Sequence, residues 1–318
     1  MIGFSILPLN FNLSILKVSV IIPVYNAADF LEFAVQSALQ QKEVEEIILV
    51  EDASTDESFN IAKKLTQQFP KVQLYRHPGG TNLGAGASRN LGIQKASMEF
   101  IAFLDADDFY LEKRFEVCQT VFEKFPNALG VYEAVDTQFQ EKDLEKEFLQ
   151  NIKGKKLTTI EEDLAPDVLF DALLQSKKGW WHLNGFTIKK ALIEQIGFFD
   201  EQLRQTQDSD FHLRSSLTQL IYPGSRQQAV AVRRIHKNNR ILNRATAIKY
   251  KRAFYRKWYF KMLTATWSKS SNRFLFNTHL SYHPEVFNRK FLWSKRIIKI
   301  LLAFVYLFRY PKLWIKLF

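Results

Sequence analysis

Four apolar segments alternate with helical segments along the first hundred residues, and this alternation restricts the fold more than any other feature. The predicted buried strands are Val18–Val24, Glu46–Glu51, Val72–Tyr75 and Met98–Leu104. The predicted helices between them are Ala28–Gln40, Asp56–Phe69 and a segment that ends near Ala96. Strands that alternate with helices at this spacing form βαβ units. The sequence therefore predicts an α/β fold with a Rossmann-like, doubly wound, mostly parallel sheet.

The later part of the chain is less regular. Its predicted elements are a helix over Leu111–Phe125, a strand over Leu129–Val135, a charged excursion or lid over Gln138–Asp163, and helices over Lys189–Ile196 and Asp208–Leu220. After Tyr222 the composition becomes basic and aromatic without a βαβ pattern, which predicts a helical extension.

Three carboxylates follow the fourth predicted strand. Asp105, Asp107 and Asp108 stand at the carboxyl end of an apolar run, where ligands bind in parallel sheets. Such closely spaced carboxylates repel one another, so a divalent cation is expected between them. The alternative is an acidic turn in which Asp108 caps a helix that begins near Tyr110.

Polar groups also follow the second and third predicted strands. Asp52 could accept a hydrogen bond from a base or a ribose, although a turn that opens a helix would use the same residues. Arg89 lies in the glycine-rich stretch Asn82–Gly92 and could hold a phosphate. That stretch matches neither a Walker loop nor a dinucleotide fingerprint.

Further candidate residues lie beyond residue 179. Asp208 and Asp210 stand at a predicted helix start, where one could act as a general base and the other could support it. The alternative is that both cap the helix. His236 could ligate a metal or have a structural role, and Trp180 and Trp181 could stack on a sugar or pack in the core.

Charge is distributed unevenly along the chain. Residues 223–318 hold 22 of the 44 Lys and Arg residues but one of the 33 acids, Glu285. An anionic partner is expected for this third, and no nucleic-acid-binding module is found. The single cysteine, Cys118, excludes an intramolecular disulfide and fits a reducing compartment.

Two stretches of the C-terminal third interleave cations with aromatic and aliphatic residues. They are Lys249–Met262 and Phe291–Phe318. Their longest nearly apolar run, Ile297–Phe308, is too short to span a bilayer, so helices that lie in an anionic membrane interface are expected. The alternative is that these helices pack on the preceding domain.

The order of the motifs resembles that of glycosyltransferase family 2, an inverting family with a GT-A fold. The matching stretches are VSVIIPVYNAADFLEFAVQSALQQ, VEDASTD, NLGAGASRNLGIQKA, FLDADD, and IGFFDEQL with QDSDFHLR. They extend from about Val18 to Asn239. The resemblance implies a GT-A domain over residues 17–240, with a nucleotide-sugar half (about 17–108) and an acceptor half (about 109–240). Residues 1–16 would be a lead segment, disordered or resulting from a wrongly assigned start codon, and residues 241–318 the membrane-associated extension.

The resemblance also implies roles for single residues. The donor nucleotide would contact Pro23, Tyr25, Asn26, Asp52, Arg89 and Asp105. Asp105 and Asp107 match the DxD motif, and with His236 they would hold Mn²⁺ or Mg²⁺ and the diphosphate. Asp208 matches the base that activates the acceptor, while Trp180, Trp181 and Asp210 are candidate acceptor contacts.

Some positions differ from the family pattern. Glu51 and Ala53 replace the usual Asp and Gly, and Gln207 replaces the Glu that often precedes the base. The Gln-x-x-Arg-Trp signature of processive synthases is not found, which favours transfer of a single sugar.

The expected activity is metal-dependent transfer from a UDP-sugar to a glycan or lipid-linked acceptor, at the cytoplasmic face of the membrane, in the synthesis of a cell-surface polysaccharide or glycoconjugate. The alternatives are a catalytically degenerate scaffold with the same fold and a phosphatase with a DxD motif.

Overall fold

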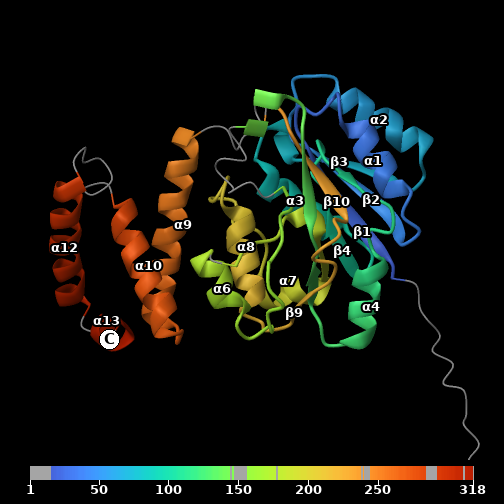
Figure 1. Ribbon diagram of the computed structural model, residues 1–318. Helices are drawn as coiled ribbons and strands as arrows, with labels where there is room; N and C mark the ends of the chain where they lie inside the picture. The colour runs from blue at the N-terminus through green and yellow to red at the C-terminus, as the bar shows by residue number, and fades with distance from the viewer. Residues whose placement is uncertain are drawn as a thin grey trace, which may run out of the picture.

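A seven-stranded sheet forms the centre of the protein. The computed structural model describes residues 16–143, 145–146, 156–176, 178–237, 239, 244–283, 292–310 and 312–317 (Figure 1). The strand order is β3-β2-β1-β4-β8-β6-β9. The bounds are β1 Val18–Val24, β2 Val44–Glu51, β3 Val72–Arg76, β4 Phe100–Phe103, β6 Gly130–Tyr132, β8 Phe186–Lys189 and β9 Ile221–Pro223.

The strand directions confirm the predicted mostly parallel sheet. β1 pairs in parallel with β2 and β4, and β2 pairs in parallel with β3. β8 runs antiparallel to both of its neighbours, β4 and β6, while β6 and β9 are parallel. The carboxyl ends of β1 to β4 therefore lie along one edge of the sheet, where this class of fold binds its ligands.

Helices cover both faces of the sheet. One face packs against α1 Leu31–Leu39, α2 Ser58–Gln68 and α4 Glu116–Lys124; the other packs against α3 Ala85–Lys95, α6 Leu169–Gln175, α7 Lys190–Ile196 and α8 Gln207–Ser216. The alternation of side chains along a strand separates the two cores. Val20 and Ile22 belong to the first core and Ile21 to the second, which explains why β1 is apolar throughout.

A small second sheet lies beside the main one. It consists of β5 Phe109–Tyr110, β7 Val135–Phe139 and β10 Ala231–Ile235, with β10 antiparallel to β5 and parallel to β7. The helix predicted from Leu111 begins only at Glu116, because the Leu111 N–H donates to the Val230 carbonyl and Lys113 has φ +58°, which a right-handed helix does not accommodate. The single strand predicted over Leu129–Val135 is divided between the two sheets. Its first part is β6 in the main sheet, while Val135 pairs with β10 as the start of β7.

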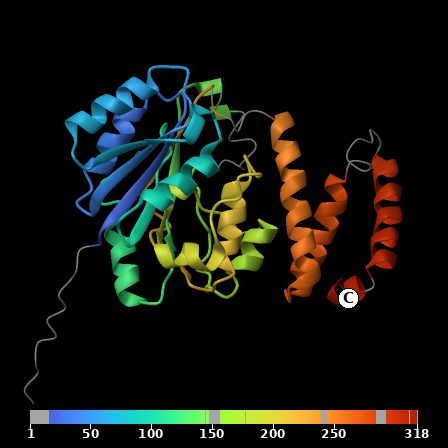
Figure 2. The same cartoon turned by 180° about the vertical axis from the view of Figure 1, so that it is seen from behind.

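The C-terminal third forms a row of helices beside the α/β part (Figures 1 and 2). They are α9 Arg244–Thr264, α10 Lys269–Tyr282, α12 Leu292–Arg309 and α13 Lys312–Leu317. Phe254, Trp258 and Met262 of α9 are buried in the same core as α6 and α8. The first basic stretch therefore packs on the domain through these residues.

The structure bears on the predicted membrane helices, and it describes only part of the lead segment and of the 138–163 excursion. Within the described part of the chain, no helix combines the length and apolar character that crossing a bilayer requires. The predicted lead segment, apart from the buried Leu16, lies outside the described residues, as do residues 144 and 147–155 of the 138–163 excursion.

Candidate functional site

A cleft of about 980 Å³ opens at the carboxyl ends of the parallel strands. Ten of the residues singled out from the sequence line it: Pro23, Tyr25, Asn26, Asp52, Arg89, Asp105, Asp107, Trp180, Asp208 and His236. They come from the ends of β1, β2, β4 and β10, from α3 and α8, and from the segment before β8. Segments more than 200 residues apart in sequence, such as those of Pro23 and His236, thus meet at one cleft.

Asp52 directly follows β2, and its buried carboxylate is held by hydrogen bonds to the glycine-rich loop. Its two oxygens accept hydrogen bonds from the backbone N–H groups of Leu83 and Gly84, at 2.7 and 2.8 Å. Gly84 has φ +93°, a conformation that glycine adopts without strain. Asp52 therefore fastens the loop that leads into α3, and it lines the cleft at the same time.

The turns after β1 and β2 hold each other through side-chain contacts. The Asn26 Oδ1 accepts a hydrogen bond from the Thr55 backbone N–H at 2.8 Å, and the Asn26 N–H donates to the Ser54 Oγ at 3.1 Å. Asn26 and Ala53 have φ values of +49° and +60°. Position 53, where the family often has Gly, is thus in the left-handed region with an alanine.

Arg89 connects the two sides of the cleft. It lies on α3, is 3% exposed, and donates to the Asp105 Oδ1 at 2.6 Å and to the Asp208 Oδ1 at 2.9 Å. Burial acts to raise the pKa of Asp105, but the Arg89 guanidinium, together with His182 and Arg233, holds this pKa below the usual range. One buried cation therefore orients a carboxylate from β4 and a carboxylate from α8.

Asp108 is not a helix cap, contrary to the expectation from the sequence. It precedes β5, and its carboxylate accepts hydrogen bonds from the Asn184 side chain at 2.7 Å and from the Arg234 N–H at 2.7 Å. It is 2% exposed. Burial, followed by the nearby carboxylates of Asp107 and Asp105, raises its pKa well above the usual range. The cluster thus carries more negative charge than its protein neighbours neutralise.

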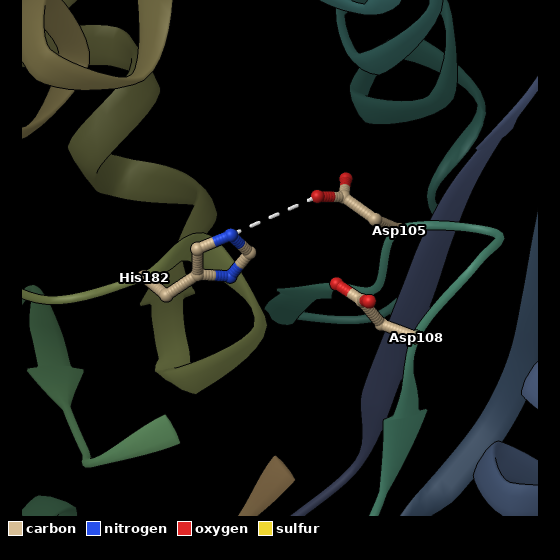
Figure 3. Close-up of side chains that lie close together, drawn as sticks. All are labelled: Asp105, Asp108 and His182. Atoms are coloured by element: carbon tan, nitrogen blue, oxygen red, sulfur yellow. Dashed lines mark ion pairs between the residues drawn. The ribbon is translucent and has the colours of Figure 1, made fainter. Parts of the chain in front are cut away.

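His182 is a site residue that the sequence did not reveal. Its Nε2 lies 3.9 Å from the Asp105 Oδ2, and ligand atoms of Asp105, Asp108 and His182 all lie within 4.8 Å of one another (Figure 3). Burial, followed by the charge of Arg233, lowers the pKa of His182 to about 3, so its imidazole is neutral. The only sequence signal was its position beside two tryptophans.

Asp107 makes a second set of contacts with the segment after β10. Its Oδ2 lies 3.1 Å from the His236 Nε2 and accepts a hydrogen bond from the Asn239 amide at 3.1 Å. The His236 ring packs against Phe30 with ring centroids 4.9 Å apart. The structure therefore brings together the predicted pair of Asp107 and His236.

The donor set fits a divalent cation. Carboxylate oxygens and a neutral imidazole nitrogen suit Mn²⁺, and the oxygens alone suit Mg²⁺. Asp105, Asp108 and His182 converge at ligand-like spacing, and Asp107 with His236 lies next to them.

Asp208 stands in the first turn of α8, with 44% of its side chain exposed to the cleft. Desolvation by the cleft walls raises its pKa; Arg89 opposes this rise, and Asp105 adds to it. The preceding residue, Gln207, is buried against Gly86 of α3, where an added Cβ would lie 2.3 Å from the Gln207 Oε1. A larger residue at position 86 would therefore require the Gln207 side chain to move.

Two predicted acceptor contacts are wrong in this structure because they are buried. Trp181 is 0% exposed, and its ring stacks on Tyr132 with centroids 4.7 Å apart. Asp210 is also 0% exposed and accepts hydrogen bonds from Arg214 and Trp258. Trp180, by contrast, is 48% exposed and lines the cleft.

The sequence matches a known protein family and several curated relatives. The family model described as "Glycosyl transferase family 2" matches residues 19–181. An uncharacterized glycosyltransferase of Haemophilus influenzae is 40% identical over 31% of this chain and 39% of its own length. Another from Rickettsia bellii is 34% identical over 64% of this chain and 28% of its own length. The chain thus spans well under two thirds of these curated relatives.

Solved structures share the fold. Staphylococcus aureus TarS 1–349 in complex with UDP-GlcNAc aligns with a TM-score of 0.62 at 18% identity, over 88% of this chain and 78% of that one. The mannosyltransferase PcManGT of Pyrobaculum calidifontis, in complex with GDP-Man and Mn²⁺, aligns with a TM-score of 0.53 at 16% identity, over 95% of this chain and 83% of that one. The fold is therefore of the GT-A type.

Proposed function

This chain belongs to glycosyltransferase family 2, and from that membership we propose that it transfers a single sugar from a nucleoside-diphosphate sugar to an acceptor hydroxyl, with inversion at the anomeric carbon. One observation carries the proposal. The Asp208 carboxylate faces the Asp105 side of the cleft, and the buried Arg89 lies between them. A donor bound on the Asp105 side would thus present its sugar toward Asp208.

The donor would occupy the side of the cleft formed by β1, β2 and β4. Tyr25 and Asn26 would border the base, and Asp52 would contact it or its ribose. We propose a UDP-sugar, because TarS was solved with UDP and with UDP-GlcNAc. PcManGT was solved with GDP-Man, so the guanine nucleotide is the main alternative.

Asp105, Asp107, Asp108, His182 and His236 are the residues that would hold Mn²⁺ or Mg²⁺. Such a cation supplies positive charge to the diphosphate as it leaves. The chain itself contributes Arg89, whose fixed guanidinium keeps the Asp105 carboxylate in place. PcManGT was solved with Mn²⁺, which supports this cofactor.

Asp208 would act as the general base on the acceptor. Its half-exposed carboxylate can take the proton from a hydroxyl while that oxygen attacks the anomeric carbon. Its raised pKa makes it a better proton acceptor than an ordinary aspartate. Trp180 at the rim offers a flat apolar face to a sugar ring of a glycan or lipid-linked acceptor.

A panel of nucleotide-sugars with Mn²⁺, monitored by release of the nucleoside diphosphate, tests the proposal. With the preferred donor, Asp208→Asn should lower kcat by about 100-fold or more while donor binding stays within a few-fold. Asp167→Asn changes an exposed aspartate and is the matched control.

Three results would overturn the assignment. Near-normal turnover of Asp208→Asn would exclude Asp208 as the base. No metal-dependent turnover with any donor would favour a degenerate scaffold, and release of inorganic phosphate would favour a phosphatase.

We also propose that the protein works at the cytoplasmic face of a membrane, in the synthesis of a surface glycan. Its single cysteine, Cys118, is buried and free, which suits a reducing compartment. The basic C-terminal third suits the anionic cytoplasmic leaflet.

A further inference from the structure

Helix α12 carries an apolar face that the rest of the described chain leaves uncovered. The exposed residues on it are Ile297, Ile300, Leu301, Phe304, Val305 and Phe308. Their spacing of three and four residues places them on one side of the helix. Phe304 is 64% exposed and Phe308 is 91% exposed. Contiguous apolar surface of this kind marks an interaction site.

The opposite side of α12 is held in place by α10. Leu307 is buried, the Tyr306 hydroxyl lies 3.2 Å from the His279 Nε2, and Lys299 donates to the Ser281 Oγ at 2.9 Å. These contacts set the rotation of α12 about its own axis. The apolar face therefore points away from the domain as a consequence of packing.

The charge of the sequence segment that carries this face indicates what covers it. Residues 286–318 contain eight Lys and Arg residues and no acid. A second copy of the same face would bring like charges together, whereas an anionic lipid surface is complementary to them. No described helix qualifies as a membrane span, so the apolar face suits a helix that lies in the plane of the interface.

We propose that the α12 face inserts into the surface of an anionic membrane and is the membrane-docking surface of this protein. This inference rests on the membrane location proposed above and names the surface that would contact the lipid. The row of helices sets the distance between this face and the cleft. Helix α10 packs on both α12 and α9, and Ala247 and Lys251 of α9 line the cleft (Figures 1 and 2). Two interhelical spacings, about 20 Å, would separate the docked helix from the helix at the cleft wall.

The experiment uses the full-length protein and vesicles of phosphatidylcholine, with or without phosphatidylglycerol. The unmodified protein should co-sediment with the anionic vesicles, and rising salt should weaken this binding. Phe304→Ser with Phe308→Ser should weaken it about tenfold or more, since two large apolar side chains are lost from the buried face.

Two variants make the result specific. Phe198→Ser changes a phenylalanine that is 42% exposed on the α/β part, and it should leave vesicle binding unchanged. Phe304→Leu with Phe308→Leu keeps the apolar face and should retain binding even if the serine variant folds poorly. Nucleoside diphosphate release in solution should be the same in all of them, so membrane binding and sugar transfer can fail separately.

Three outcomes would overturn the proposal. The first is equal binding to neutral and anionic vesicles, or binding to neither. The second is full binding by the folded serine variant. The third is a dimer, seen by analytical ultracentrifugation and abolished by the serine substitutions, without vesicle binding; that result would assign the face to a second copy of the chain.

Discussion

At the scale of single residues, the site depends on charges that are held in place before any ligand binds. Arg89 fixes Asp105 and Asp208, and Asn184 supports both the Asp105 N–H and the Asp108 carboxylate. None of these partners is adjacent in sequence. A sequence pattern can identify the carboxylates, but only contacts across the fold determine their protonation.

Activity should be lost in acid at a pH above the ordinary range for an aspartate. Asp208 has a raised pKa and acts only as the carboxylate, so activity is present above that pKa and falls as pH decreases through it. Measurement of kcat/KM against pH tests this. An acidic limb at or below the ordinary aspartate pKa of about 3.9 would contradict the prediction.

Replacement of Ala53 tests the strained turn. With φ at +60°, Ala53→Gly should raise the free energy of unfolding by up to about 1 kcal/mol, because relief of strain exceeds the entropy that glycine loses. Ala53→Val should lower it, since a β-branched residue is disfavoured there. Chemical denaturation measures both, and the opposite order would contradict the prediction.

At the scale of elements, α9 of the C-terminal row contacts α8 of the α/β part through two side chains. The Trp258 indole donates to the Asp210 Oδ1 at 3.1 Å, and Lys257 lies 2.9 Å from the same oxygen. Asp210 stands two residues after Asp208 on α8. The extension therefore supports the helix that carries the proposed base.

Loss of the indole N–H should destabilise the protein. Trp258→Phe removes a donor from a buried carboxylate and should lower the free energy of unfolding by about 1–3 kcal/mol, seen as a lower Tm. Trp180→Phe is the matched control, because Trp180 is half exposed and its replacement should leave Tm unchanged. Equal Tm values for both variants would show that the contact contributes nothing.

At the scale of the whole molecule, the α/β part and the helical row form one packed unit. Leu313 and Leu317 of α13 are buried in the core that also contains α6, α8 and α9. Lys316 of α13 donates to the Met262 carbonyl at 2.7 Å. Removal of residues 285–318 would expose this core, so point substitutions on the α12 face are the better test of membrane binding.

Divalent cations should stabilise the folded protein. Binding at the carboxylate cluster favours the native state by about 2.7 kcal/mol at a concentration 100 times Kd. Tm should therefore rise with Mn²⁺ and return to its starting value with a chelator. Asp107→Asn should reduce this rise, whereas Asp167→Asn should not; an equal rise in both would place the cation elsewhere.

The sequence by itself determined the order of the βαβ units, the parallel sheet, and the edge at which Asp52, Asp105 and Asp107 meet, because side-chain periodicity and strand ends are local properties. Tertiary structure alone decided that Asp210 and Trp181 are buried, that Asp108 caps no helix, and that His182 joins the acids. It also decided that α9 packs on the domain while α12 keeps an exposed apolar face. An amphipathic pattern shows that a helix has an apolar side, but only long-range packing decides which neighbour covers it.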